Sequence, residues 1–460
     1  MSNNQEWIQH EFNSINLLDP RLHKRFFKIA TELADRPADS IHSATADWAS
    51  SKASYRFFEN AEVNSQKILS PHFESTAWRC SNYKKIIITE DTSYLDYNKH
   101  TKTTGLGKSF KSYGKDVKGI CMHAGLALSP AGLPLGLIYN KLWTRKENHL
   151  TGNDRTSMPI QLKESYRWIE CGRQATELLQ DQEIILVSDR EGDIYEAYEN
   201  AVDCNYDVVI RCQHDRVLDD EIKISEILSL EKVRGSHSVI IPGNGSRKEK
   251  KVKLEIRFKK IELSARPNMQ KTQQNKRREN IELYVVDASD IVNDINWRII
   301  TTLPVKNLQD AKDVLNYYKM RWNVELYFKA LKTGCTVEDC RLGEGGKLIK
   351  YIALMSVIAW RIFWMTHISR HDPNISCENI LMESEWKSAW WLLHRKKVKE
   401  GKMKRSDIPI KPPSLNEAIR WIAGNGGFKG RKGDGNPGLI SIWRGWNRVL
   451  IGAEMFEFLN

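Results

Sequence analysis

The sequence lacks the cysteine patterns of a zinc-bound or disulfide-bonded protein. Its eight cysteines are scattered over 460 residues, and no two of them form a C-x-x-C pair. The closest groupings are Cys335 with Cys340 and Cys212 with His214, and neither has the spacing of a zinc site. We therefore expect ordinary reduced thiols.

A targeting segment and a membrane-length apolar run are also lacking. Residues 1–13 contain no apolar core of the kind that a secretory signal needs. The most apolar stretch, residues 351–365, is interrupted by Arg361 and is shorter than the ~20 residues that cross a bilayer. We expect a core or interface helix there, and a cytoplasmic protein with no membrane partner.

The glycine-rich segment near the end of the sequence does not have the pattern of a phosphate-binding loop. Gly430, Gly433, Gly435 and Gly438 follow no strand-like run, and G-K-[ST] does not accompany them. These glycines predict a turn.

Basic charge is what the sequence has in excess. Seventy Lys and Arg against 58 Asp and Glu give a net charge of +12 and a pI near 9.1, which favours a polyanionic partner. At 460 residues the chain is longer than one core accommodates, so two or three domains are expected.

Three acidic residues stand in positions that suit catalysis. Asp91 closes the apolar run 86–88, Asp189 closes the run 184–187, and Glu325 lies within a long helical pattern. Two carboxylates at strand ends and one on a later helix can meet and hold Mg²⁺, which prefers oxygen ligands. Two ions held in this way activate the attacking oxygen and stabilise the leaving oxygen in phosphodiester transfer.

The helical pattern around Glu325 has a polar stripe beside an apolar face. At about 100° per residue, Tyr318, Arg321, Glu325, Lys329 and Lys332 share one narrow stripe. The stripe extends roughly 21 Å at ~1.5 Å per residue, long enough to follow several phosphates. The alternative is a solvated face held by pairs such as Glu325 with Lys329.

These residues resemble the sequence motifs of a known protein family. The pattern Y-x₂-R-x₃-E-x₆-K, from Tyr318 to Lys332, resembles the signature of the DDE transposases of the IS-four insertion-sequence family, closest to the Tn-five (IS-fifty) branch. EDTSY around Asp91 and SDREGDIY around Asp189 resemble the two aspartate motifs of that branch. The likeness extends from ASYRFFEN near residue 55 to GRKGDGNPG near the C-terminus.

Residue patterns and the resemblance together predict an α+β / α/β fold with three regions. Residues 1–75 would form a helical DNA-end-binding domain, 76–370 a ribonuclease-H-like catalytic domain, and 371–460 a helical dimerisation domain. The gap of 136 residues between Asp189 and Glu325 contains its own strand-like runs, which predict a β-rich insertion at about 207–305. Its polar, basic segment 266–280 is expected to be a loop.

The resemblance implies a cut-and-paste transposase that cleaves transposon ends through a hairpin and joins the 3′-ends to target DNA. Asp91, Asp189 and Glu325 would be catalytic and bind two Mg²⁺ ions, for which Mn²⁺ would substitute. Tyr318, Arg321, Lys329 and Lys332 would hold phosphates near the cleaved end.

Two residues of the insertion also match DNA contacts of the branch. Trp297 matches a tryptophan that holds a flipped base, although a core tryptophan in a strand is the alternative. Arg211 matches a DNA-contacting arginine. Gln213 stands where the family has a neighbouring lysine, which puts that second contact in doubt.

The first helical segment presents a further basic face. Asp19 and Pro20 predict an N-cap with proline at the first helical position. Beyond them, cations group on one side and can neutralise phosphates, or can simply form a solvated face; in the resembling family DNA is bound here. The grouped cations are Arg21, Lys24, Arg25 and Lys28.

The implied partners are double-stranded DNA, as terminal repeats and target, and a second copy of the chain in the paired-end complex. The setting would be the bacterial cytoplasm, with nucleoid association when DNA is bound. Trp443, Trp446, Ile440 and Ile442 could form a dimer patch or pack locally. Two other functions remain open: a metal-dependent nuclease of the same fold, and a non-catalytic DNA-binding relative.

Overall fold

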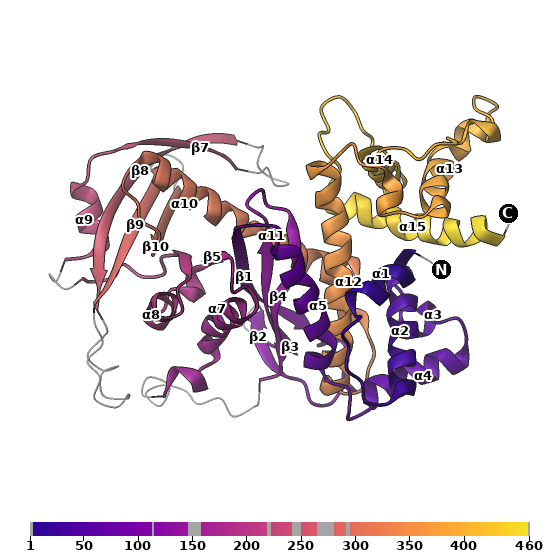
Figure 1. The fold of residues 1–460 in the computed structure, drawn as a ribbon, viewed down its shortest axis with the longest axis horizontal. Coiled ribbons are helices and arrows are strands. Elements are labelled where there is room, and N and C mark those ends of the chain that lie inside the picture. Colours follow the sequence, from indigo (N-terminus) through magenta and orange to yellow (C-terminus); the bar gives the residue numbers. More distant parts are fainter. Residues whose placement is uncertain are drawn as a thin grey trace.

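The chain forms a mixed β-sheet with helical regions on its flank (Figure 1). The computed structural model describes residues 3–112, 115–145, 158–218, 222–241, 250–264, 280–290 and 295–458. Within these residues, ten strands join into one sheet. The strands are β1 (Lys85–Asp96), β2 (Gly107–Ser112), β3 (Lys115–Leu128), β4 (Pro134–Trp143), β5 (Glu183–Ser188), β6 (Asp207–Arg211), β7 (Gly235–Ile241), β8 (Lys250–Leu263), β9 (Ile281–Asp290) and β10 (Ile295–Thr301).

Five of these strands give a ribonuclease-H-like core. β4, β3 and β1 form an antiparallel meander, and β5 and β6 continue from β1 as parallel neighbours. The apolar runs of β1 and β5 are buried because helices cover both faces of a sheet of this kind. The expected fold class is confirmed, although β2 has no counterpart among the strands expected from the sequence.

The β-rich insertion extends the core sheet. β10 pairs antiparallel with β6, and β9, β8 and β7 follow outward in that order. The structure differs from the expected boundary at residue 207, because β6 pairs in parallel with β5 and completes the core. Residues 266–279 of the basic segment lie outside the described residues.

The N-terminal region is helical, as its sequence predicts. Asp19 accepts a hydrogen bond from the backbone N–H of Arg21, and Pro20 begins the second helix, which confirms the expected cap. Phe26 and its apolar neighbours on that helix are buried, so the basic side faces outward. The helices are α1 (Asn3–Glu11), α2 (Pro20–Asp35), α3 (Ile41–Ala44), α4 (Trp48–Glu59) and α5 (Ser65–Cys80).

The remaining helices cover the sheet and form the C-terminal region. α12 lies between the core sheet and the N-terminal helices (Figure 1). The helices are α7 (Arg167–Leu178), α8 (Tyr195–Asp203), α9 (Ile224–Leu230), α10 (Leu308–Met320), α11 (Trp322–Lys329), α12 (Gly345–His371), α13 (Glu383–Lys399), α14 (Leu415–Asn425) and α15 (Leu439–Phe458).

α12 contains the apolar stretch noted in the sequence. Its 27 residues are enough to cross a membrane, but 78% of its most apolar window is buried inside the protein. It packs against α5 and β4, and the indole N–H of Trp360 donates to the carbonyl of Pro134. The stretch is therefore a core helix, longer than residues 351–365 alone.

Candidate active site and nucleic-acid interface

Asp91 on β1 and Asp189 directly after β5 lie at equivalent positions in the register of these two parallel strands. The register of β1 and β5 pairs Thr89 with Val187, and the same offset of 98 residues separates the two aspartates. Neighbouring strands lie roughly 4.8 Å apart, so the register brings the two carboxylates into one site. Asp189 follows the end of β5, as expected, whereas Asp91 lies inside β1 and not at its end, because β1 continues to Asp96.

The environment of Asp91 is crowded with negative charge. Burial and the charge of Asp189 raise its pKa to about 7, although Arg321 and the backbone N–H of Thr92 oppose this rise. That N–H donates to Asp91 Oδ1 over 2.7 Å. A cation placed between the carboxylates would relieve the repulsion, since an opposite charge favours the ionised form.

Arg321 joins Asp91 to Glu325. Its Nη1 lies 2.9 Å from Asp91 Oδ2, and its Nη2 donates to Glu325 Oε1. Burial lowers the pKa of Arg321, but Tyr318, Asp91 and Glu325 outweigh burial and raise it. The guanidinium is therefore a fixed positive charge between the strand acid and the helix acid, which brings Glu325 to the edge of the aspartate pair.

The polar stripe is built from three helical segments. α10 ends at Met320, α11 begins at Trp322, and the π-helix η4 (Ala330–Gly334) follows. Arg321 keeps helical backbone angles at the junction, where the backbone forms tighter i→i+3 hydrogen bonds. The π-helix changes the direction of the side chains at its end, and such segments often occur at functional sites.

The members of the stripe differ in their surroundings. Tyr318 is buried and meets Trp297 edge-on, with ring centroids 5.8 Å apart. Lys332 is turned inward, and its Nζ donates to the carbonyl of Tyr94 over 2.7 Å. Lys329 is exposed. Only part of the expected stripe therefore faces solvent.

Trp297 and Arg211 lie on paired strands. Trp297 is half-buried on β10, and Arg211 ends β6, where it pairs with Ile299 two residues farther along β10. Arg211 Nη2 donates to the carbonyl of Asn296 over 3.1 Å. The two side chains expected to contact DNA therefore come from neighbouring inner strands of the sheet, and Trp297 lies next to Tyr318.

The N-terminal basic face is present but partly neutralised within the chain. Arg21 forms an ion pair with Asp19 at 3.2 Å, and Lys28 Nζ donates to Ser50 Oγ over 2.7 Å. Lys24 is exposed and Arg25 is half-buried. Lys24 and Arg25 are thus the members of the group best placed for a new anionic partner.

Sequence reasoning missed an exposed face of α4. Trp48 is 69% exposed and Tyr55 is 39% exposed, while Lys52 and Arg56 are also exposed. Their spacing places them on neighbouring positions of one helix face. Aromatic and basic side chains together suit nucleic acid, and the helical spacing in the sequence could have revealed them.

Trp322 and Glu90 were also missed. Trp322 is 56% exposed directly after Arg321. Glu90 is buried next to Asp91, and burial raises its pKa to about 8 against the opposing hydrogen bonds of Ser188 and Cys171. The alternation of β1 could have placed Glu90 on the face opposite Asp91.

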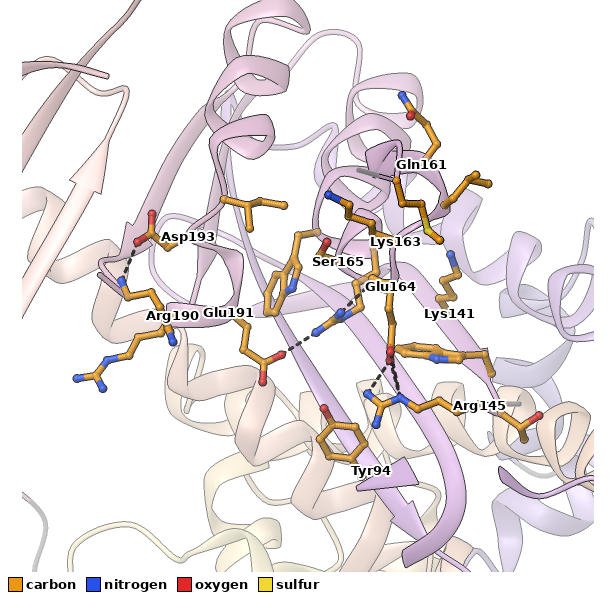
Figure 2. A pocket seen from close by; sticks show the side chains of 18 of the residues that line it. Tyr94, Lys141, Arg145, Gln161, Lys163, Glu164, Ser165, Arg190, Glu191 and Asp193 are labelled. Atoms are coloured by element: carbon orange, nitrogen blue, oxygen red, sulfur yellow. Dashed lines mark hydrogen bonds and ion pairs between the residues drawn. The ribbon is translucent and has the colours of Figure 1, made fainter. Parts of the chain in front are cut away.

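A charged cleft of about 900 Å³ opens beside the site (Figure 2). It lies between Tyr94 on β1, the end of β4, and the segment that follows Asp189. Ion pairs cross its walls, with Arg145 Nη2 2.7 Å from Glu164 Oε1 and Arg167 Nη2 2.6 Å from Glu191 Oε2. Basic side chains outnumber acidic ones in its lining, which suits a phosphate backbone.

Known protein families match three regions of the chain. Residues 4–63 match the Transposase DNA-binding family, residues 225–359 the Transposase DDE domain, and residues 357–458 the Transposase Tn5 dimerisation domain. The chain is a DDE transposase of the Tn5/IS4 type. The transposase therefore binds DNA and forms dimers, and its DDE domain depends on divalent metal.

The transposase is also similar to a solved structure, the piggyBac transposase synaptic complex with hairpin DNA determined by cryo-electron microscopy. The two chains are 11% identical, and the match covers 80% of this chain and 73% of that chain with a TM-score of 0.36.

The acidic residues of the transposase fit a divalent cation by their chemistry. Asp91 and Asp189 supply oxygen ligands, and the raised pKa of Asp91 reflects negative charge that a cation would neutralise. Among the described residues, no three His, Cys, Asp or Glu side chains lie close enough to surround one ion. Arg321 lies between Asp91 and Glu325 and forms an ion pair with each of them.

Proposed function

We propose that this transposase works by cut-and-paste transposition, with Asp91, Asp189 and Glu325 as its catalytic acids. The observation that carries the proposal is the shared register of the two aspartates, together with the bridge from Asp91 through Arg321 to Glu325. These contacts support a site in which acids from distant parts of the sequence act together, within a chain whose DDE domain depends on divalent metal.

The three acids would hold two Mg²⁺ ions, and Mn²⁺ would substitute. When bound, such a pair activates the attacking oxygen and stabilises the leaving oxygen of phosphodiester transfer. Arg321 would then leave the carboxylates that it pairs now and take a phosphate near the cleaved end. Exposed Lys329 lies farther along the same helical path and would bind another phosphate. Tyr318 and Lys332, which are turned inward, would support Arg321 and Lys329 from the protein interior.

The reaction that we propose runs in four steps. Water attacks one strand at the transposon end, and the freed 3′-hydroxyl attacks the opposite strand to give a hairpin. Water reopens the hairpin, and the 3′-ends join target DNA. Trp297 would stack on a base extruded during hairpin formation, and its half-buried place beside Tyr318 would fix the indole ring for that contact.

Strand transfer distinguishes this function from that of a nuclease with the same fold. The full-length transposase is incubated with a duplex of the terminal repeats that flank its coding sequence, with target plasmid and Mg²⁺. Joined products in addition to cleaved ends are expected. Cleavage without any joined product would favour the nuclease, and binding without cleavage would favour a non-catalytic relative.

Removing one acidic charge at a time tests the assignment of the site. Asp91→Asn, Asp189→Asn and Glu325→Gln should each reduce nicking below detection, because each variant loses a metal-ligand charge. End binding should stay within about twofold, since the basic surfaces are unchanged. A variant that nicks at nearly the wild-type rate would remove that residue from the catalytic set.

A further inference from the structure

Glu90 is a buried carboxyl group directly beneath the acidic site. It is 1% exposed in the middle of β1, and the alternation of the strand turns it to the face opposite Asp91. A buried carboxyl group is costly unless hydrogen bonds compensate it. The contacts of Glu90 therefore matter for the acids on the other face.

Glu90 connects the segments that carry both aspartates. Ser188, which precedes Asp189, donates from Oγ to Glu90 Oε1 over 2.6 Å. Glu90 Oε2 lies 3.2 Å from His123 Nε2, and His123 Nδ1 lies 2.9 Å from the hydroxyl of Thr92, which follows Asp91. The chain of contacts thus begins next to one aspartate and ends next to the other.

The direction of these hydrogen bonds follows from Arg167. Its Nε donates to Thr92 Oγ1 over 2.8 Å, so the hydroxyl proton of Thr92 is free to reach His123 Nδ1. Burial keeps the pKa of His123 well below its usual range, so the ring is neutral. A neutral ring has one N–H, so His123 can accept from Thr92 at Nδ1 and donate to Glu90 from Nε2.

The same arginine closes the chain of contacts into a loop. Arg167 Nη2 lies 2.6 Å from Glu191 Oε2, and Glu191 lies in the lining of the cleft (Figure 2). The backbone N–H of Glu191 donates to Asp189 Oδ1 over 2.8 Å. Glu191 therefore orients the carboxylate of Asp189, while Glu90 holds the side chain of the neighbouring Ser188.

Backbone pairing between the two strands stops just short of the acids. The last paired residues of β1 and β5 are Thr89 and Val187. Beyond them, β1 continues to pair with β3, and Ser188 pairs with Ile210 of β6. The side-chain hydrogen bond from Ser188 to Glu90 therefore links the two segments at the next register position, directly before the aspartates.

We propose that Glu90 is a positioning residue of the transposase, which sets the separation of Asp91 and Asp189 through Ser188 on one side and through His123 and Thr92 on the other. This inference rests on the proposed catalytic role of the two aspartates. Partners that orient metal ligands typically change metal affinity or activity by about 10- to 100-fold when removed.

Thr92→Val, Ser188→Ala and Glu90→Gln test the proposal against a matched control. Thr89→Val removes a buried hydroxyl from the same strand that lies outside the loop of contacts. Each full-length variant is measured in complex with an end duplex, for thermal unfolding, end binding, the Mg²⁺ dependence of nicking, and Mn²⁺ binding by electron paramagnetic resonance.

Thr92→Val and Ser188→Ala should raise the Mg²⁺ concentration for half-maximal nicking about 10-fold and weaken Mn²⁺ binding by a similar factor. Nicking should recover at saturating metal. Glu90→Gln, which keeps the shape and a hydrogen-bonding group, should show a smaller shift than Glu90→Leu. Thr89→Val should match the wild type, and the effects of Thr92→Val and Ser188→Ala should be non-additive, because both act through Glu90.

Two results would overturn the proposal. One is metal dependence in Thr92→Val, Ser188→Ala and Glu90→Gln that equals the control. The other is a uniform loss of rate and thermal stability with unchanged Mn²⁺ binding, which indicates a structural role only. If Asp91→Asn itself keeps nicking and Mn²⁺ binding, the proposed function fails. Normal metal binding in Thr92→Val alone is a distinct outcome, because it contradicts only the positioning role of Glu90.

Discussion

Arg321 is a largely buried cation that bridges two of the proposed catalytic acids. It is 15% exposed and contacts a strand carboxylate and a helix carboxylate at once. Such a buried bridge is stable only while both partners are charged, since an unpaired buried charge is costly. The same guanidinium is therefore suited to exchange between carboxylates and phosphates as the charge of the site changes.

Trp297→Ala should separate the two cleavage steps. The indole ring is half-buried against Tyr318. In the proposed reaction, loss of its stacking on an extruded base would weaken the hairpin step by about 1–3 kcal/mol and leave the first nick unaffected. First-strand nicking should persist while hairpin product falls roughly 10-fold or more, as measured on denaturing gels. Trp297→Phe serves as the aromatic control. Equal loss of both steps, or an unfolded protein, would assign Trp297 to the core.

At the scale of elements, α4 has an exposed basic and aromatic face, which we expect to contact DNA together with the first helical segment. Lys52→Ala and Arg56→Ala should each weaken end binding, because each removes one cation that neutralises a phosphate. The slope of log affinity against log salt should decrease by about 1 for each change. Lys396→Ala on α13, 87% exposed, is the control. Unchanged salt slopes in both α4 variants would exclude this face from the interface.

The N-terminal helices are fixed to the catalytic core by a buried charge network. Glu11 on α1 accepts from Arg79 Nη1 over 2.9 Å and lies 2.5 Å from His72 Nδ1, both on α5. His72 Nε2 accepts from the backbone N–H of Leu137 on β4. Arg361 of α12 lies over the rings of Trp7 and Trp364 nearby. The DNA-binding helices are thereby held in one orientation to the active site.

This network predicts acid sensitivity. Burial would raise the pKa of Glu11, but Arg79 and His72 outweigh burial and lower it to about 2. A depressed carboxyl pKa contributes stability that is present above the ordinary value of about 4.5 and is lost as pH falls toward 2. The shift corresponds to roughly 3 kcal/mol.

The free-energy difference between the wild type and Glu11→Gln should therefore shrink as pH falls from 5 toward 3. Denaturant unfolding at several pH values measures it. Glu59→Gln, which alters a more exposed pair with Lys347, should show a much smaller trend in the same direction, because solvent screens that pair. A constant difference between wild type and Glu11→Gln would contradict the stabilising role of the Glu11 ion pairs.

At the scale of the whole molecule, the C-terminal helices are part of the core as well as a dimerisation region. Ile442, Trp443 and Trp446 are buried within the chain, so this patch packs locally and is not a free dimer surface. Trp443 lies against Gly334 of the π-helix η4, where even a Cβ atom would approach its ring to 3.0 Å. Truncation near residue 412 would remove these contacts, so we expect it to destabilise the chain rather than leave single-end binding intact.

A point change on the outer face of α15 is the better test of pairing. Ile451 is 59% exposed and Met455 is 62% exposed, one turn apart. Ile451→Asp should abolish paired-end complexes and double-end products while single-end binding remains, because a charge opposes burial in an interface. Gel shifts with one and two end fragments measure this. Leu230→Asp, at an 84% exposed site on α9, is the control. A folded Ile451→Asp protein that still pairs ends would place the dimer contact elsewhere.

The sequence by itself determined the local features of this protein. The runs before Asp91 and Asp189 gave strands because β-branched residues suit a buried sheet, and Asp19 with Pro20 gave a capped helix through local hydrogen bonding. The spacing around Glu325 also revealed the helical path and the family. These features depend on neighbours within a few residues, which the sequence displays directly.

Only the tertiary structure decided what the side chains meet. Strand register brought Asp91 opposite Asp189, and the fold turned Tyr318 and Lys332 inward while it left Trp48 exposed. Likewise, the Trp443 and Trp446 patch became core because α15 packs on η4. Each outcome depends on contacts between residues far apart in the sequence, and burial is set by the partner surface as much as by the residue itself.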